Sequence, residues 1–166
     1  MKTIHYRGQL VTFQLPAHWT AEYEEPDGGT FYDPNDDSVT LRLNVMTLRS
    51  PHEFGPNESD IGFPEDLPNL KGPFEVVNQQ AICIGPPNRH TENGIAIDIH
   101  IWGVTRAVPP RTLRLAIFTT TVRADQADSE KTRSTLAMLL NEVRACIISD
   151  ASPVSKPSWW QRLMGG

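Results

Sequence analysis

The stretch that decides the fold is Gly94–Ala124, GIAIDIHIWGVTRAVPPRTLRLAIFTTTVRA. Isoleucine occupies every second position from Ile95 to Ile101, and this period of two is typical of a pleated strand. A second alternating run extends from Leu113 to Thr120. Pro109 and Pro110 lie between the two runs, where their rings fix φ and remove two backbone N–H donors. The stretch therefore predicts a hairpin of two long antiparallel strands.

Folding this hairpin about a turn at residues 108–110 predicts which residues face one another across the strands. The expected pairs are Ile101 with Ile117, Trp102 with Ala116, and His100 with Phe118. One face of the hairpin then carries the isoleucines of the first strand, and the other face is mixed. We expect the apolar isoleucine face to be covered by the rest of the protein.

Shorter elements are expected on both sides of this hairpin. Residues 3–14 predict a first hairpin with its turn at Arg7-Gly8, and Trp19 is expected to fold over the end of the sheet. Residues 39–46 and 74–84 each have the pattern of a strand. Between them, residues 51–73 contain five prolines and three glycines, which predicts a long loop.

From Asp125 the apolar period changes from two to about 3.6 residues, which predicts one amphipathic helix over 125–148 with Asp125 and Asp128 at its start. The apolar helical face is Leu136, Leu139, Leu140, Val143, Cys146 and Ile147. The predicted fold is α+β: an antiparallel sheet of about six strands with this C-terminal helix packed on the face of Ile95, Ile97, Ile99 and Ile101. Residues 1–149 are expected to form a single domain, and residues 150–166 a flexible tail.

The composition and charge of the chain argue against several classes of function. The 166 residues carry a net charge of −5, which argues against nucleic acid as a partner because nucleic-acid-binding proteins usually have an excess of basic residues. No window approaches the roughly 20 apolar residues of a membrane-spanning helix, and the first residues do not have the pattern of a signal peptide. Cytoplasmic localisation is therefore expected, with Cys83 and Cys146 as small buried apolar residues.

Several features together resemble the PsbP-like superfamily. They are the opening hairpin, the aromatic-x-Leu-Pro-x-x-Trp motif at residues 13–19, the antiparallel strands and the closing helix. That superfamily includes a Ran-binding nuclear-transport factor, DcrB-like bacterial proteins and the Eag chaperones of type VI secretion. The resemblance implies a sheet between helical layers and a role in binding rather than catalysis. Two departures are the Pro-rich 51–73 segment in place of a long mid-chain helix, and no sign of the anchor of exported relatives.

Asp98 and His100 are the one candidate acid/base pair for an enzyme. They lie two residues apart on one strand, so a carboxylate could orient an imidazole there, with Thr120 expected opposite Asp98. No nucleophile motif accompanies the pair, and a polar pair on a half-exposed sheet is the simpler interpretation. The histidines are scattered and the cysteines far apart, and no Gly-rich phosphate loop is present, so no metal or cofactor is predicted. Asp33-x-Asn35-x-Asp37 is interpreted as an acidic turn.

The mixed face of the central hairpin offers a second candidate site. Trp102 and Phe118 form its apolar centre, bordered by His100, Asp98 and Arg114. These residues are either core beneath a second layer or an exposed groove for a partner. The predicted function is a cytoplasmic, non-catalytic binding or chaperone-like module that could serve a secretion system, with an enzyme using Asp98 and His100 as the alternative. The expected partner is another protein or a second copy of the chain.

The tail offers a third candidate site. Trp159 and Trp160 are candidate anchors of a short docking motif, since tryptophan is common at interaction hot spots. Contact with a membrane surface, packing on the domain itself and a tail without a role remain alternatives.

Overall fold

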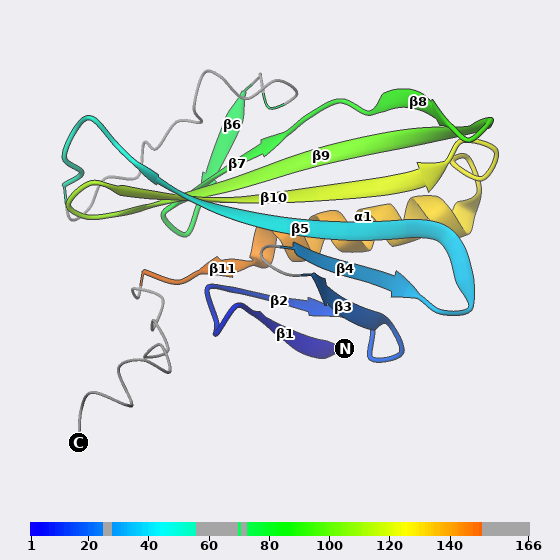
Figure 1. Cartoon of the computed structure of the whole chain (residues 1–166), viewed down its shortest axis with the longest axis horizontal. Coiled ribbons are helices and arrows are strands. Elements are labelled where there is room, and N and C mark those ends of the chain that lie inside the picture. The colour runs from blue at the N-terminus through cyan, green and yellow to red at the C-terminus, as the bar shows by residue number, and fades with distance from the viewer. Residues whose placement is uncertain (25–27, 56–69, 71–72, 151–166) are drawn as a thin grey trace, which may run out of the picture.

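The structure, a computed structural model, describes residues 1–24, 28–55, 70 and 73–150. Within them, eight strands form one large antiparallel sheet (Figure 1). Its strands are β3 (Thr20–Glu24), β4 (Gly28–Asp33), β5 (Asp36–Arg49), β6 (Phe74–Val77), β7 (Gln80–Ile84), β8 (Asn88–Glu92), β9 (Ile95–Val108) and β10 (Thr112–Arg123). The order is β3-β4-β5-β10-β9-β7-β6, and β8 pairs with the other half of β9. The predicted α+β class is confirmed, with more strands in the sheet than the six expected.

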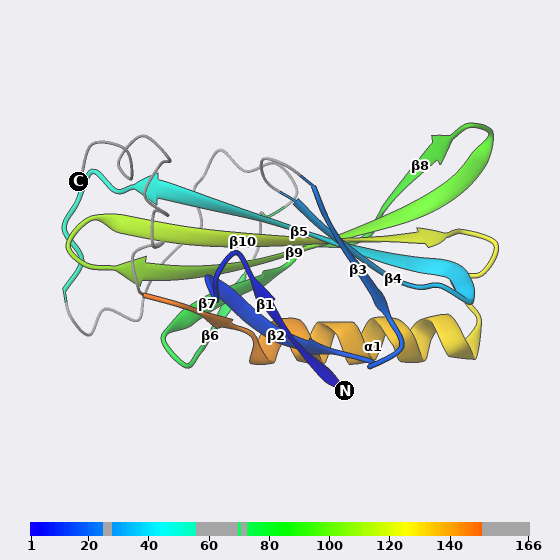
Figure 2. The same ribbon diagram turned by 60° about the horizontal axis from the view of Figure 1, so that its bottom comes forward.

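A second layer lies on one face of this sheet. It consists of a small antiparallel sheet, with β1 (Lys2–Tyr6), β2 (Val11–Leu15) and β11 (Ile147–Ile148), and the helix α1 (Glu130–Ala145). In Figure 2, the helix and the β1–β2 hairpin lie together below the large sheet. The predicted first hairpin is confirmed, and Arg7, Gly8 and Gln9 make its turn with positive φ angles.

The helix is shorter than predicted, and its first residue differs. Ser129, and neither Asp125 nor Asp128, is the N-cap: its Oγ accepts a hydrogen bond from the backbone N–H of Thr132 at 3.1 Å. Satisfying this free N–H is what an N-cap side chain contributes to a helix. Residues 125–128 form turns, and the chain leaves the helix at Cys146 to form β11.

The hydrophobic core fills the space between the two layers, and its position corrects one prediction. Helix residues Leu139 and Val143 belong to the same buried cluster as Trp102 and Phe118. The helix therefore covers the Trp102 face of the large sheet, and the prediction that it packs on the Ile95, Ile97, Ile99 and Ile101 face is wrong.

The helix covers this face because of β5. This strand pairs with β10, and the alternating pattern of the hairpin alone does not predict that pairing. Residues directly opposite in antiparallel strands share a face of the sheet. Leu43 of β5 is opposite Phe118, which is opposite Trp102. The apolar residues of β5 thus extend the Trp102 face into one larger apolar surface. The β5 residues of this surface are Val39, Leu41, Leu43 and Val45. Burying that surface outweighs the more regular isoleucine row of β9.

The central hairpin is confirmed, with a register that differs from the expected one by two residues. Val108 pairs with Thr112, so the turn is centred one residue later than predicted. The observed pairs are Ile101 with Thr119, Trp102 with Phe118, and His100 with Thr120. Because the difference is an even number, every side chain keeps its expected face.

The predicted strand 74–84 is a hairpin, and two parts of the predicted loop 51–73 contact the large sheet or its β9–β10 turn. The predicted strand 74–84 is divided into β6 and β7 by a tight turn at Asn78 and Gln79, both with positive φ. Within the Pro-rich segment 51–73, the backbone N–H of Phe54 donates to the carbonyl of Pro110 at 2.7 Å. Leu70 is buried, and its carbonyl accepts a bond from the Cys83 thiol at 3.5 Å. The remainder of the predicted loop, and residues 151–166 of the predicted tail 150–166, lie outside the described residues.

No helix in the described ranges is long and apolar enough to cross a membrane. Cys83 and Cys146 are free thiols and both are buried, as predicted.

Candidate functional site

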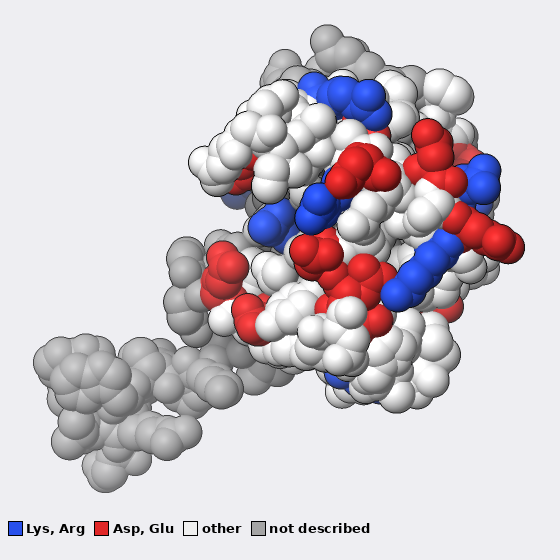
Figure 3. All heavy atoms as spheres, turned by 90° about the vertical axis from the view of Figure 1, so that its right-hand side faces the viewer, with Lys and Arg blue, Asp and Glu red and all other residues white. Residues whose placement is uncertain are grey.

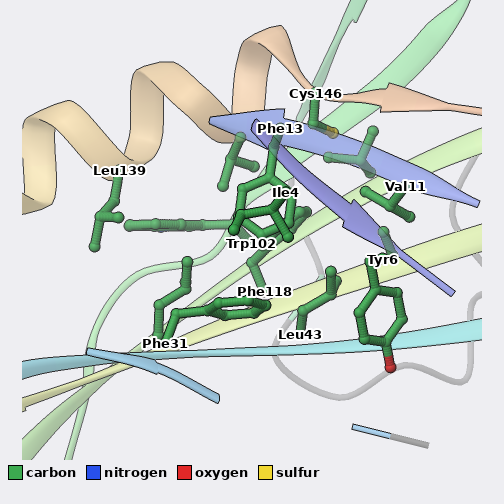
Figure 4. Packing of buried hydrophobic residues seen from close by; sticks show 14 of the residues in the cluster. Ile4, Tyr6, Val11, Phe13, Phe31, Leu43, Trp102, Phe118, Leu139 and Cys146 are labelled. Atoms are coloured by element: carbon green, nitrogen blue, oxygen red, sulfur yellow. The ribbon is translucent and has the colours of Figure 1, made fainter. Parts of the chain in front are cut away.

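Trp102 and Phe118, the centre of the candidate groove, are core residues. Their exposed fractions are 3% and 0%, and Figure 4 shows them among side chains of the second layer. The ring of Phe13, from β2, packs edge-on against Phe118 with centroids 5.5 Å apart. The prediction of an exposed strip on this face is wrong, because α1 and the β1–β2 hairpin together cover it.

Arg114, predicted at the border of that groove, is also buried and has a structural role. Its guanidinium donates to the backbone carbonyl of Ser149, and burial lowers its pKa. Arg106 donates to the carbonyl of Ile148 at 3.1 Å. The two arginines therefore hold the end of the described chain against the large sheet.

Gln80 completes this attachment from β7. Its side-chain Nε2 donates to the carbonyl of Cys146 at 2.8 Å, and its Oε1 accepts from the N–H of Ile148 at 2.7 Å. The amide thus pairs with β11 as a neighbouring strand residue would. Sequence reasoning missed Gln80, since a lone glutamine in an apolar run is its only signal.

Asp98 and His100 do not form the predicted acid/base arrangement. Both carboxylate oxygens of Asp98 are bound by Arg89 of β8, at 2.8 Å from Nε and 2.9 Å from Nη2. This ion pair lowers the pKa of Asp98, and burial lowers the pKa of the His100 imidazole. Val122, not Thr120, is opposite Asp98. Asp98 therefore fixes β8 to β9 and does not orient His100, so the geometry does not favour the enzyme.

The opposite face of the large sheet, called here the outer face, is only partly covered. Near β6 and β7 its residues are buried, including Cys83, Thr105 and Leu115. Toward the start of β9, partly or fully exposed residues form a continuous surface that we call the outer strip. Its members are Ile99 and Ile101 of β9, Ile117, Thr119 and Thr121 of β10, and Arg42 and Asn44 of β5.

The composition of the outer strip is that of a binding surface. Three partly exposed isoleucines, Ile99, Ile101 and Ile117, lie on two neighbouring strands, and Ile95, on the far side of the buried Ile97, is 48% exposed. Threonines and an asparagine border them, and Arg42 donates from Nη1 to Thr121 Oγ1 at 3.3 Å. The period-two pattern located this isoleucine row and assigned it to the wrong side of the sheet.

A small pocket of about 180 Å³ lies at the end of the molecule where α1 begins. Asp33 Oδ2 is 3.2 Å from His18, and Asp36 Oδ2 is 2.7 Å from the Lys131 ammonium. Backbone N–H donors of Asn35 and Ser38 bind the remaining oxygens, and these contacts lower the pKa of both carboxyls. Figure 3 shows the interleaved acidic and basic residues over this end. The charges are paired with one another and join the helix to the β4–β5 turn.

Metal ligands do not gather anywhere in the described residues: no three His, Cys, Asp or Glu side chains lie close enough to hold an ion. Asp33 and Asn35 belong to the tight turn between β4 and β5, so the acidic turn expected there is confirmed. Trp159 and Trp160 lie outside the described residues, and their predicted docking role stays a prediction.

No family model and no curated protein matches the sequence. Solved structures do match the fold. A protein of Bacteroides thetaiotaomicron superposes with a TM-score of 0.56 at 12% identity, over 89% of this chain and 48% of its own. LpqN, involved in cell envelope biogenesis of Mycobacterium tuberculosis, superposes with a TM-score of 0.54 at 15% identity, over 84% of this chain and 83% of LpqN. The fold is PsbP-like.

The PsbP-like resemblance seen in the sequence is thereby confirmed at the level of the fold. Cyanobacterial PsbP from Synechocystis also aligns, with a TM-score of 0.42 at 10% identity, over 89% of this chain and 92% of its own. This chain spans about half the length of the Bacteroides protein. At these identities the likeness concerns the arrangement of strands and helix and says nothing of shared partners.

Proposed function

We propose that this PsbP-like chain is a non-catalytic binding protein, a chaperone-like module that engages a protein partner through its outer strip. One observation carries the proposal: three partly exposed isoleucines, Ile99, Ile101 and Ile117, lie on the sheet face opposite α1 and the β1–β2 hairpin. Burying such a row against a partner gains roughly 25 cal/mol for each Å² of apolar surface removed from water. The resemblance to the PsbP-like superfamily, which implies a role in binding rather than catalysis, supports the same class.

We also propose a kind of partner and a cellular compartment. The partner is another protein or a second copy of the chain, and the place is the cytoplasm, where the free thiols of Cys83 and Cys146 would stay reduced. Service to a secretion system is the role that the resemblance to Eag chaperones suggests.

Site-specific photocrosslinking tests the surface directly. Ile101 is replaced by p-benzoylphenylalanine in one variant, and exposed Arg133 of α1 in a matched control variant. After irradiation in the native cell, we expect an adduct of one defined mass from position 101 and not from position 133. The adduct should disappear when Ile117→Asp is added, because a carboxylate in the apolar row opposes burial. Equal adducts from both positions, or none from position 101, would contradict the proposal.

A further inference from the structure

Arg42 distinguishes the outer strip from an ordinary apolar surface. Its side chain is exposed, and no carboxylate of the described residues forms an ion pair with it. Other arginines do have such partners: Arg89, Arg106, Arg111, Arg123 and Arg144. In a chain with a net charge of −5, Arg42 is thus a cation left available in the middle of a sheet face.

The position of Arg42 relative to the isoleucines is fixed by the register. Arg42 is opposite Thr119, and Thr119 is opposite Ile101, so the three residues form one row across β5, β10 and β9. Neighbouring strands are about 4.8 Å apart, which places Arg42 roughly 10 Å from the isoleucines of β9. An α-helix is about 10 Å wide with its side chains, so one helix lying along the strands would cover both.

Glu22 and Glu24 of β3 lie on this face, and among the described residues neither forms an ion pair with Arg42. Glu22 of β3 is opposite Thr30, which is opposite Arg42. Two strand spacings, roughly 10 Å, separate them, which is about one Debye length at physiological salt. Tyr32 moreover donates to Glu22 at 2.6 Å.

We propose, resting on the function proposed above, that the outer strip receives an amphipathic helix of another protein whose apolar row is bordered by Asp or Glu. The apolar row lies over Ile99, Ile101 and Ile117, and the acidic border meets Arg42. A second copy fits less well, because two outer strips face to face bring two Arg42 cations into one interface without a carboxylate between them. The apolar row alone would accept any apolar partner, whereas Arg42 selects a partner with acidic residues beside its apolar row.

Two synthetic helical probes test this charge preference. They share one leucine row at i, i+3, i+4 and i+7 spacing and differ only in their polar residues, which are all Glu in one and all Lys in the other. Binding to the full chain is measured by fluorescence anisotropy at low salt. We expect the Glu probe to bind about fivefold tighter or more, since an exposed ion pair contributes up to about 1 kcal/mol. The net charge of −5 would by itself favour the Lys probe, so this preference can only come from local charge.

Variants decide where the preference arises. Arg42→Glu should abolish or reverse it and Arg42→Gln should reduce it, whereas Arg133→Glu, with the same change in net charge on exposed α1, should leave it unchanged. Circular dichroism and thermal unfolding check that each variant folds. Equal effects of Arg42→Glu and Arg133→Glu, tighter binding of the Lys probe, or no binding of either probe would overturn the proposal.

Failure of this inference is distinguishable from failure of the proposed function. If Ile101→Asn weakens both probes equally and Arg42→Glu changes neither, the outer strip binds apolar partners without preference for acidic ones. The inference is then wrong and the proposed function stands. If position 101 also gives no crosslinked adduct in the cell, both are wrong.

Discussion

At the scale of single residues, alternate positions of β9 have opposite roles. Trp102 and Val104 point into the core, whereas Ile99 and Ile101 point to the outer face and remain partly exposed. In this part of the strand the tryptophan of the mixed row is therefore buried, and the isoleucine next to it is not. Residue type along one strand does not decide this, because burial depends on what the neighbouring strands contribute to the same face.

The first prediction compares two neighbours on β9. Trp102→Ala should lower the free energy of unfolding by about 3–5 kcal/mol, since it leaves a cavity among Phe118, Phe13 and Leu139. Ile101→Ala should cost clearly less, because part of that side chain already contacts water. Urea unfolding of both variants measures the difference. A larger loss for Ile101→Ala would mean that the buried face has been wrongly assigned.

The second prediction concerns pH and His100. Burial lowers the pKa of His100 in the folded protein, although Asp98 partly opposes this. The unfolded chain then takes up the proton first, so stability is greatest above the usual histidine pKa of about 6.5 and falls as the pH drops below it. His100→Gln should flatten this part of the stability curve. The lowered pKa of Asp98 acts at more acidic pH, where protonation removes its pairing with Arg89. An unchanged slope between about pH 6.5 and 5 in His100→Gln would contradict the assignment.

At the scale of elements, the helix and β11 close the core. Leu139 and Val143 are almost fully buried against the sheet. Just past the helix, the carbonyl of Cys146 and the N–H of Ile148 bind the buried amide of Gln80. The helix thus contributes apolar packing, and the short strand after it contributes satisfied hydrogen bonds between the two layers.

The third prediction tests the packing of the helix. Leu139→Ala and Val143→Ala should each destabilise the fold by roughly 2–4 kcal/mol, because each leaves a hole between the helix and the sheet. Chemical denaturation midpoints provide the measurement. Midpoints equal to wild type would mean that the helix docks by another face.

The fourth prediction tests the link to β11. Gln80→Leu should cost about 2 kcal/mol or more, since a buried carbonyl at Cys146 and a buried N–H at Ile148 both lose their partner. Hydrogen exchange at the Ile148 amide should accelerate in the variant more than at amides in the middle of β10. Unchanged exchange at Ile148 would show that Gln80 does not hold the strand.

Elements with a strong apolar period could be predicted from the sequence, and those without it could not. The β9–β10 hairpin, most of β5 and the helix were predicted because their patterns extend over many residues. Strands β3 and β8 were missed, since their segments TAEYE and NRHTE are mainly polar and exposed. Their pairing with β4 and β9 supplies the stability that their composition does not indicate.

The candidate site was located in part. The isoleucine row was recognised, but its face could not be assigned because the pairing of β5 with β10 is a contact between residues far apart in the chain. The same missing contact made Trp102, Phe118 and Arg114 candidates for a surface. The role of Arg114 depends on a backbone carbonyl, that of Ser149, which no side-chain pattern reveals.

At the scale of the whole molecule, one layer covers one face of the large sheet and leaves part of the other open. This arrangement is the PsbP-like fold that the chain shares with LpqN. The central claim is that the outer strip is the open, partner-binding side of the sheet. Every proposal about a partner depends on that orientation.

Thiol reactivity tests this orientation most directly, because both native cysteines are buried. Ile101→Cys places a thiol on the outer strip, and Ala116→Cys places one on the covered face with little change in volume. We predict that a disulfide reagent modifies Ile101→Cys in the native protein at least about tenfold faster than Ala116→Cys, whose rate should match that of the native cysteines. Rapid modification of Ala116→Cys together with protection of Ile101→Cys would contradict the account.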